Sequence, residues 1–185
     1  STIVCKRYTF ILPPAGPNGV QGVGVAIKNS LMGALQVIHP YSPRILRLRM
    51  AGKGRSLSIL VAYAPTNSPT ELNINRREYY DLLQKAYDDI WPMGSQDVKV
   101  ILTDANAETG NNRAIAPHII GPHGLPSLHS TPEDTPNGRL FIPFCTTNNL
   151  VIGYTWFYKP KASQKHTFYP SDYRQPPKVI DHILI

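Results

Sequence analysis

Short apolar runs that end in polar residues are the main pattern along this chain. The run at 98–102 is followed directly by Thr-Asp-Ala-Asn, and the run at 57–62 by Tyr-Ala-Pro-Thr. A third run, 179–185, carries Asp181 inside an otherwise apolar segment. Runs of this length between turn residues are typical of buried strands. A carboxylate among apolar residues is costly unless it is paired, hydrogen-bonded or bound to a metal, so Asp181 is either a structural bond-maker or part of a site.

The rest of the pattern predicts a sheet-rich fold with few helices. Segment 45–50 alternates apolar residues with arginines, and the glycines after it predict a hairpin with the strand at 57–63. Apolar residues at helical spacing predict helices over 76–90 and 139–148, the second weakened by Pro143. Further strands are predicted at 22–27, 150–158, 167–169 and 179–185. Because strands outnumber helices, we expect an α/β fold of two packed sheets with helices outside them.

The composition is that of a basic globular protein. A chain of 185 residues fits one domain, and its 42% hydrophobic and 17% charged content excludes a disordered one. Lys and Arg outnumber Asp and Glu by 19 to 12, which favours polyanions without requiring them. No run approaches the ~20 apolar residues of a membrane span, so we expect no membrane partner. Two cysteines, Cys5 and Cys145, are too few for a disulfide scaffold or a zinc site, which favours a reducing, intracellular compartment.

The polar residues at the strand ends suggest a shared site. Asp104 and Asn106 are two residues apart, the spacing at which side chains on a strand point the same way. A carboxylate there can bind Mg²⁺ or accept a proton from water, and an amide can donate to a charged oxygen. Tyr63 offers a hydroxyl, and Asp181 can orient a base or a metal-bound water. This set suits metal-assisted attack of water on a phosphodiester, whereas the structural alternative is an Asx turn at 104–106.

Cations alternate with aromatic residues in segment 158–174. Lys161, Lys165 and Arg174 are candidate nucleic-acid contacts there, and a solvated hairpin is the alternative reading. His182 is adjacent to Asp181 and is therefore expected on the opposite face of the strand, as a packing residue. The loop histidines match no zinc-ligand spacing, so solvated side chains are favoured over a metal site at His118, His123 and His129.

Several motifs resemble the endonuclease/exonuclease/phosphatase superfamily. Segments 101–107, 61–65 and 179–184 resemble the family's Gly-Asp-Phe-Asn-Ala, Tyr-Ala-Pro and Ile-Asp-Tyr/His-Ile-Leu strands. Segment 137–157 more narrowly resembles the endonuclease region of non-LTR retrotransposons of the RTE type. It also resembles host proteins of the craniofacial development protein 2 type that derive from them. Segment 166–172 resembles their Tyr-Thr-Trp-x-Ser-Pro-Asp hairpin.

The resemblance implies a four-layer α/β sandwich that cuts DNA phosphodiester bonds with Mg²⁺. It implies that Asp104 activates the attacking water, that Asn106 stabilises the pentacovalent state, and that both residues lie at the metal. It further implies that Tyr63 contacts phosphate, that Asp181 orients the catalytic histidine, and that Thr167 contacts nucleic acid.

Two family motifs are not found in the chain. The family begins with an Asn-bearing strand and a Gln-Glu-Thr strand whose Glu is the principal Mg²⁺ ligand, and it ends with Ser-Asp-His. We therefore expect 1–185 to be a single domain lacking both segments, a piece of a longer parent that could also carry a reverse transcriptase. Alone it should be a weak or inactive nuclease, nuclear if its target is chromosomal DNA. The alternatives are a domesticated, catalytically silent binding domain and a phosphatase of the same superfamily.

Overall fold

The chain forms two compact units. The computed structural model describes residues 1–16, 22–68, 73–90, 96–126 and 135–185. The first unit contains Ser1–Tyr63 and Leu82–Leu102, and the second contains Ala64–Asp81 and Thr103–Ile185. The single domain predicted over residues 1–185 stays a prediction.

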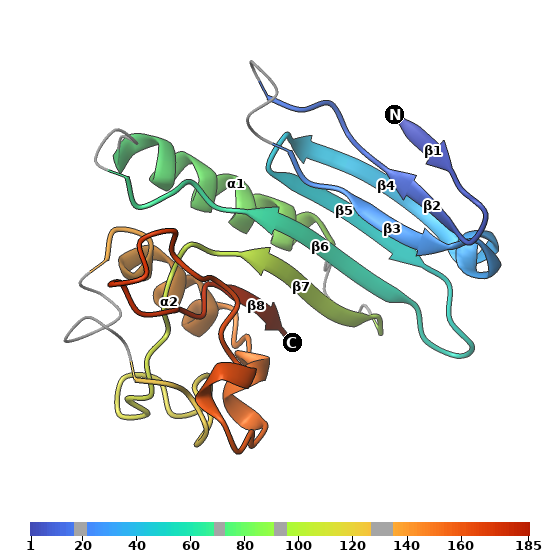
Figure 1. Ribbon diagram of the computed structural model, residues 1–185. Helices are drawn as coiled ribbons and strands as arrows, with labels where there is room; N and C mark the ends of the chain where they lie inside the picture. Colours follow the sequence, from blue (N-terminus) through green and yellow to red (C-terminus); the bar gives the residue numbers. More distant parts are fainter. Residues whose placement is uncertain (17–21, 69–72, 91–95, 127–134) are drawn as a thin grey trace. The chain divides into compact units, whose positions relative to one another are not determined.

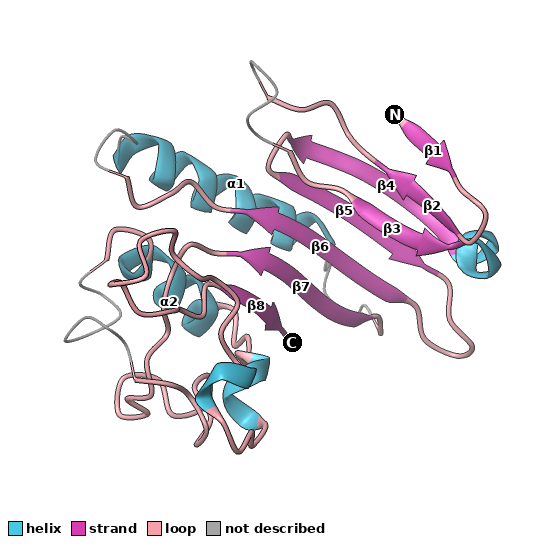
Figure 2. Cartoon of the chain, viewed as in Figure 1, coloured by secondary structure: helices cyan, strands magenta, loops and turns pink. Residues whose placement is uncertain are grey.

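The strands form two sheets, which confirms the predicted α/β class with mostly antiparallel sheets (Figure 1). The smaller sheet contains β1 (Thr2–Val4), β2 (Tyr8–Ile11) and β3 (Val25–Lys28). The larger sheet has the order β4 (Leu35–Ser42), β5 (Ile45–Met50), β6 (Leu57–Tyr63), β7 (Val98–Asp104) and β8 (Asp181–Leu184). The helices are α1 (Asn73–Ile90), α2 (Gly138–Thr147) and the short 3₁₀ segments η2 (Asn29–Ala34), η4 (Gly153–Trp156) and η5 (Ala162–Gln164), as Figure 2 shows.

The predicted hairpin of the first unit is confirmed. β5 pairs antiparallel with β6 over the whole length of β5, from Ile45 opposite Ala62 to Met50 opposite Leu57. Gly54, in the connecting turn, has φ +90°, a conformation that glycine adopts without steric cost.

The core of the first unit lies between its two sheets. Ile11 of β2 and Ile27 of β3 form one buried cluster with Leu46 and Leu48 of β5. The alternation of β5 explains this arrangement, because its leucines face the smaller sheet while the arginines between them point the other way. Burial of side chains of this size stabilises a fold by about 1.5–3 kcal/mol each.

Helix α2 provides much of the core of the second unit. Phe141, Ile142 and Cys145 are buried on it, whereas Pro143 is exposed. Asn137, which directly precedes the helix, is fully buried and donates from Nδ2 to the carbonyl oxygen of Pro65 at 2.6 Å. This bond fastens the segment after Tyr63 to the beginning of α2.

Two predicted strands of the second unit are wrong. In segment 150–158 a single bridge joins Ile152 to Leu184, and the chain then turns into η4. Segment 167–169 likewise makes one bridge, between Phe168 and Lys178. The apolar residues of segment 150–158 that are buried pack in the core of the unit and do not pair as a strand.

Candidate active site

The end of β7 folds into a tight turn that joins the first two predicted site residues. The backbone N–H of Asn106 donates to Asp104 Oδ1 at 3.1 Å, which is an Asx turn. β7 ends at Asp104, and Asn106 has φ +47°, a left-handed conformation that Asn tolerates better than most residues. The two side chains are therefore related by a turn, and the strand alternation expected from their spacing does not apply.

The segment 64–67 holds Asn106 from the other side. Asn106 Nδ2 donates to the carbonyl oxygen of Ala64 at 3.0 Å, and Asn67 Nδ2 donates to the carbonyl oxygen of Asn106 at 2.5 Å. The N–H of Ala64 donates to the carbonyl oxygen of Asp104 at 2.8 Å. One of the two N–H groups of the Asn106 amide is thus used to fix the side chain.

Asp181 lies close enough to Asp104 for the two charges to interact. The N–H of Ala105 donates to the carbonyl oxygen of Ile180 at 2.9 Å, which brings the beginning of β8 to the end of β7. Partial burial raises the pKa of the half-buried Asp104 carboxyl, the N–H of Asn106 opposes this shift, and the Asp181 carboxylate adds to it. Two neighbouring carboxylates repel each other, and a bound cation would reduce this repulsion.

Thr167 positions Asp181 through the backbone. Its hydroxyl oxygen accepts hydrogen bonds from the N–H groups of Ile180 at 3.1 Å and Asp181 at 3.2 Å. Thr167 itself is exposed. Its predicted contact with nucleic acid stays a prediction.

His182 faces the interior, as its position next to Asp181 predicts. It is 3% exposed and stacks with the rings of Phe141 and Tyr154, at centroid distances of 5.1 and 5.7 Å. Its Nε2 lies 2.8 Å from the carbonyl oxygen of Ala107, to which it donates. Burial lowers the pKa of His182 to about 4, so the ring is neutral at physiological pH and packs as a neutral ring.

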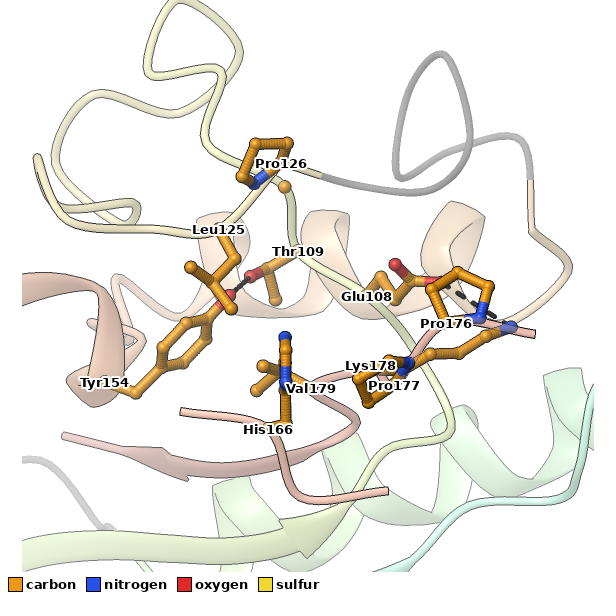
Figure 3. A pocket seen from close by; sticks show the side chains of 11 residues that line it. Glu108, Thr109, Leu125, Pro126, Tyr154, His166, Pro176, Pro177, Lys178 and Val179 are labelled. Atoms are coloured by element: carbon orange, nitrogen blue, oxygen red, sulfur yellow. Dashed lines mark hydrogen bonds and ion pairs between the residues drawn. The ribbon is translucent and has the colours of Figure 1, made fainter. Parts of the chain in front are cut away.

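A hollow of about 340 Å³ opens beside the turn in the second unit. Its wall contains Asn106 and two charged residues that sequence reasoning missed, Glu108 and Lys178. Lys178 Nζ lies 3.8 Å from Glu108 Oε1 (Figure 3). The other residues that line the hollow are Asn67, Thr135, Pro136, Phe168 and Ile180. No signal in the sequence marks Glu108 and Lys178 as partners, because they come from loops 70 positions apart.

Tyr63 is the last residue of β6 and ends the first of the two segments that form the first unit. The guanidinium carbon of Arg44 lies 4.8 Å from the centre of its ring, and Arg44 Nη1 donates to its carbonyl oxygen at 3.3 Å. The phosphate contact predicted for the Tyr63 hydroxyl stays a prediction.

The predicted nucleic-acid cations differ in how firmly they are held. Arg174 pairs with Asp172 at 2.9 Å, and Lys165 Nζ donates to the carbonyl oxygen of His123. Lys161 is exposed. Aromatic rings close to them in the sequence are also open to solvent, with Tyr158, Tyr169 and Tyr173 exposed by 71%, 63% and 92%.

The other candidate groups stay outside this site. Within the described ranges, no three His, Cys, Asp or Glu side chains gather as a metal-binding group. His118 is exposed and His129 lies outside the described residues. Cys145 is fully buried, and burial raises the pKa of its thiol, as expected of a core residue.

None of the helices described has both the length and the apolar character required for a membrane crossing.

The sequence is similar to that of craniofacial development protein 2. It is 31% identical to this protein from Tragulus javanicus over 139 residues, which are 75% of this chain and 22% of the relative. The Bos taurus protein matches with the same identity over the same length, and the match covers 21% of it. The chain therefore spans about a fifth of the curated relatives it matches. No protein-family model matches it.

The fold is similar to that of the endonuclease domain of TRAS1, a telomere-specific non-LTR retrotransposon. The TM-score is 0.58 at 12% sequence identity, and the match covers 95% of this chain and 65% of that domain. An identity this low shows the shared fold alone. The chain is thus related in sequence to craniofacial development protein 2 and folds like a non-LTR retrotransposon endonuclease domain, which confirms the resemblance to the endonuclease/exonuclease/phosphatase superfamily.

Proposed function

We propose that this chain belongs to a Mg²⁺-dependent DNA endonuclease of retrotransposon type and carries the part of its site that activates water at a backbone phosphate. The observation that carries the proposal is the hydrogen bond from the N–H of Ala105 to the carbonyl oxygen of Ile180, which joins the strand ends bearing Asp104 and Asp181 beside a hollow lined by Asn106. The likeness to a retrotransposon endonuclease domain supports it at the level of the fold.

Asp104 is the proposed acceptor of the proton from the attacking water. A general base works best when its pKa approaches the working pH, and the raised pKa of Asp104 moves in that direction. The Asx turn fixes one of its oxygens against the N–H of Asn106 and leaves the other to meet water. In the proposed reaction the water oxygen forms a bond to phosphorus while the ester oxygen leaves.

Asn106 and Tyr63 are the proposed hydrogen-bond donors to the phosphate. The amide group of Asn106 donates one N–H to the carbonyl oxygen of Ala64. This bond fixes the side chain, and its second N–H is the proposed donor to a phosphoryl oxygen. The Tyr63 hydroxyl is the second proposed donor to phosphate. Asp181 would orient the group that protonates the leaving oxygen.

The donor set fits Mg²⁺, which proteins hold through one or two carboxylates together with substrate phosphate and water. Asp104 and Asn106 are the proposed ligands, and the charge of Asp181 adds to the attraction. The bound ion would neutralise charge on the phosphate oxygens during attack.

DNA is the proposed substrate because the chain is basic and exposes cations and aromatic rings in one segment. Lys161, Lys165 and Arg174 would contact backbone phosphates, and the exposed tyrosines beside them could stack on bases. A longer parent would also carry a reverse transcriptase domain, and action on chromosomal DNA would place the protein in the nucleus.

A second candidate function is that of a domesticated, catalytically silent domain that binds nucleic acid or protein. The observation that favours it is the sequence match to craniofacial development protein 2. In that case the acids would be retained for folding, and the basic segment for binding.

A plasmid-nicking assay tests the proposal. Supercoiled plasmid is incubated in Mg²⁺ or in EDTA with the protein extended along its reading frame at both ends, beside the variants Asp104→Asn and Asp81→Asn of the same extended protein. Asp81 is an exposed carboxylate on α1 and serves as the matched control. We expect Mg²⁺-dependent nicking that falls by at least about a hundredfold in Asp104→Asn and is unchanged in Asp81→Asn.

The same assay separates the alternatives. Equal nicking by the unchanged chain and Asp104→Asn would remove Asp104 from the mechanism. DNA binding without nicking would support the silent domain. Hydrolysis of a small phosphate monoester, with plasmid left intact, would support the phosphatase.

A further inference from the structure

Lys178 occupies a position shared by two hollows of the second unit. It lines the hollow that contains Asn106, and it also lines a neighbouring hollow of about 250 Å³ bounded by Thr109, Tyr154 and His166. Figure 3 shows its side chain extending along the wall toward Glu108, from the segment that begins with Pro176 and Pro177. Among the described residues that line the hollow beside Asn106, Lys178 is the one cation.

The backbone of Lys178 is fixed on both of its polar groups. Its N–H donates to the carbonyl oxygen of Phe168 at 2.9 Å, and its carbonyl oxygen accepts from the N–H of Phe168 at 3.1 Å and of Thr167 at 2.9 Å. A closed pair of bonds of this kind sets the position of the Cα atom. The side chain therefore leaves the wall of the hollow from a rigid base.

The ammonium of Lys178 is held loosely by Glu108. Their separation of 3.8 Å is longer than the 2.7–2.9 Å of a direct charge-assisted hydrogen bond. The Glu108 side chain is 9% exposed and that of Lys178 is 27% exposed, so the carboxylate is enclosed while the ammonium keeps access to the hollow. An ammonium has three donors, which leaves capacity for a second anion.

The charges around the hollow create a need for such a cation. Glu108 lines the hollow, and Asp104 and Asp181 flank the residues Asn106 and Ile180 that also line it, so the negative charge of these acids repels a phosphate. A lysine in the wall offsets this repulsion and gives an entering phosphodiester a defined place to bind.

We propose that Lys178 binds a backbone phosphate of the nucleic acid in this hollow and that Glu108 keeps its ammonium there when the hollow is empty. The inference rests on the proposed function and names the residue that anchors its substrate. Lys178 is a binding residue in this proposal, not a participant in bond breaking.

The test measures equilibrium binding of a short double-stranded DNA oligonucleotide in EDTA, where no Mg²⁺-dependent cleavage occurs. Affinity is determined at several salt concentrations for the unchanged chain, Lys178→Gln, Lys178→Arg and the control Lys53→Gln. Lys53 is exposed in the turn between β5 and β6. We expect Lys178→Gln to weaken binding about tenfold and to lower the salt slope by about one, whereas Lys178→Arg and Lys53→Gln stay close to the unchanged chain.

A double variant separates phosphate binding from general charge. Lys178→Gln/Glu108→Gln leaves the net charge of the hollow unchanged and leaves no enclosed carboxylate without a counter-charge. If Lys178 holds a phosphate, the double variant keeps the lowered salt slope. Recovery of both affinity and slope in the double variant would overturn the proposal, as would a Lys178→Gln variant that binds like Lys53→Gln.

The outcome is independent of the nicking assay. Loss of binding in Lys178→Gln, with nicking unaffected by Asp104→Asn, would keep the phosphate anchor and reject the nuclease mechanism. Nicking that depends on Asp104, with DNA binding indifferent to residue 178, would reject the anchor and keep the nuclease.

Discussion

The hydroxyl oxygen of Thr167 accepts the backbone N–H of Asp181 at 3.2 Å, and so holds the first residue of β8 in place. The same oxygen accepts the N–H of Ile180. A side chain expected to meet nucleic acid thus has a second role, because it sets the backbone from which a site carboxylate extends.

Replacement of Thr167 by Val should loosen the beginning of β8. The change removes the acceptor for two N–H groups while keeping the branched shape, and we expect a loss of about 1 kcal/mol in the free energy of unfolding. Hydrogen exchange at the amides of Ile180 and Asp181 should become faster. Thr167→Ser, which keeps the hydroxyl, is the control, and equal exchange rates in the Val and Ser variants would contradict the assignment.

The pKa of Asp104 should depend on Asp181. Burial and the neighbouring carboxylate raise the pKa of Asp104 above its ordinary value of 3.8, so removal of the Asp181 charge should lower it. Carboxyl-carbon NMR titration of the unchanged chain and of Asp181→Asn measures both values. The control Asp81→Asn should leave the pKa of Asp104 unchanged. An unaltered Asp104 pKa in Asp181→Asn would show that the two carboxylates do not interact.

Stability should decline in mild acid because of His182. Its pKa is about 4 in the folded chain and 6.5 when unperturbed, so between these values the unfolded chain binds more protons than the folded one. The free energy of unfolding therefore falls as pH falls through this window, by about 3 kcal/mol in total. Urea titrations at pH 7, 5.5 and 4 should show a smaller fall in His182→Gln, and parallel curves for the two proteins would exclude His182 as the cause.

The two thiols should differ in reactivity. Cys5 is exposed, while Cys145 is fully buried and burial raises the pKa of its thiol, so little thiolate forms at neutral pH. A disulfide reagent should modify one thiol per folded chain and the second after unfolding. In Cys5→Ser the fast reaction should disappear, and rapid modification of the folded variant would contradict the burial of Cys145.

Local patterns predicted those elements whose side chains alternate or repeat cleanly. The strands at 45–50 and 57–63 agree with β5 and β6 because their apolar faces meet a core and their ends are set by turns. β4 gave no such pattern, since His39 and Pro40 interrupt it. An edge strand tolerates proline because one of its sides lacks a partner strand, and β4 is the edge of its sheet.

In the candidate site, too, local sequence patterns predicted some residues, whereas others are brought together only by the packing of loops. Asp104, Asn106 and Asp181 were identified because they follow or interrupt apolar runs and match family motifs. Glu108 and Lys178 lie in loops, and their meeting depends on how the loops pack across the second unit. The strand predicted at 150–158 failed for a related reason, because burial of Leu150 and Ile152 produces the same apolar pattern as pairing.

The Asx turn at Asp104 has a consequence for how this fold can change over evolutionary time. Its carboxylate closes the bend that ends β7, so the residue contributes to folding whether or not any phosphate is ever cut. Selection for a well-folded chain alone would retain the acid after the loss of catalysis. A descendant that no longer cuts phosphodiester bonds would therefore still carry the same acid at this position as its active ancestor.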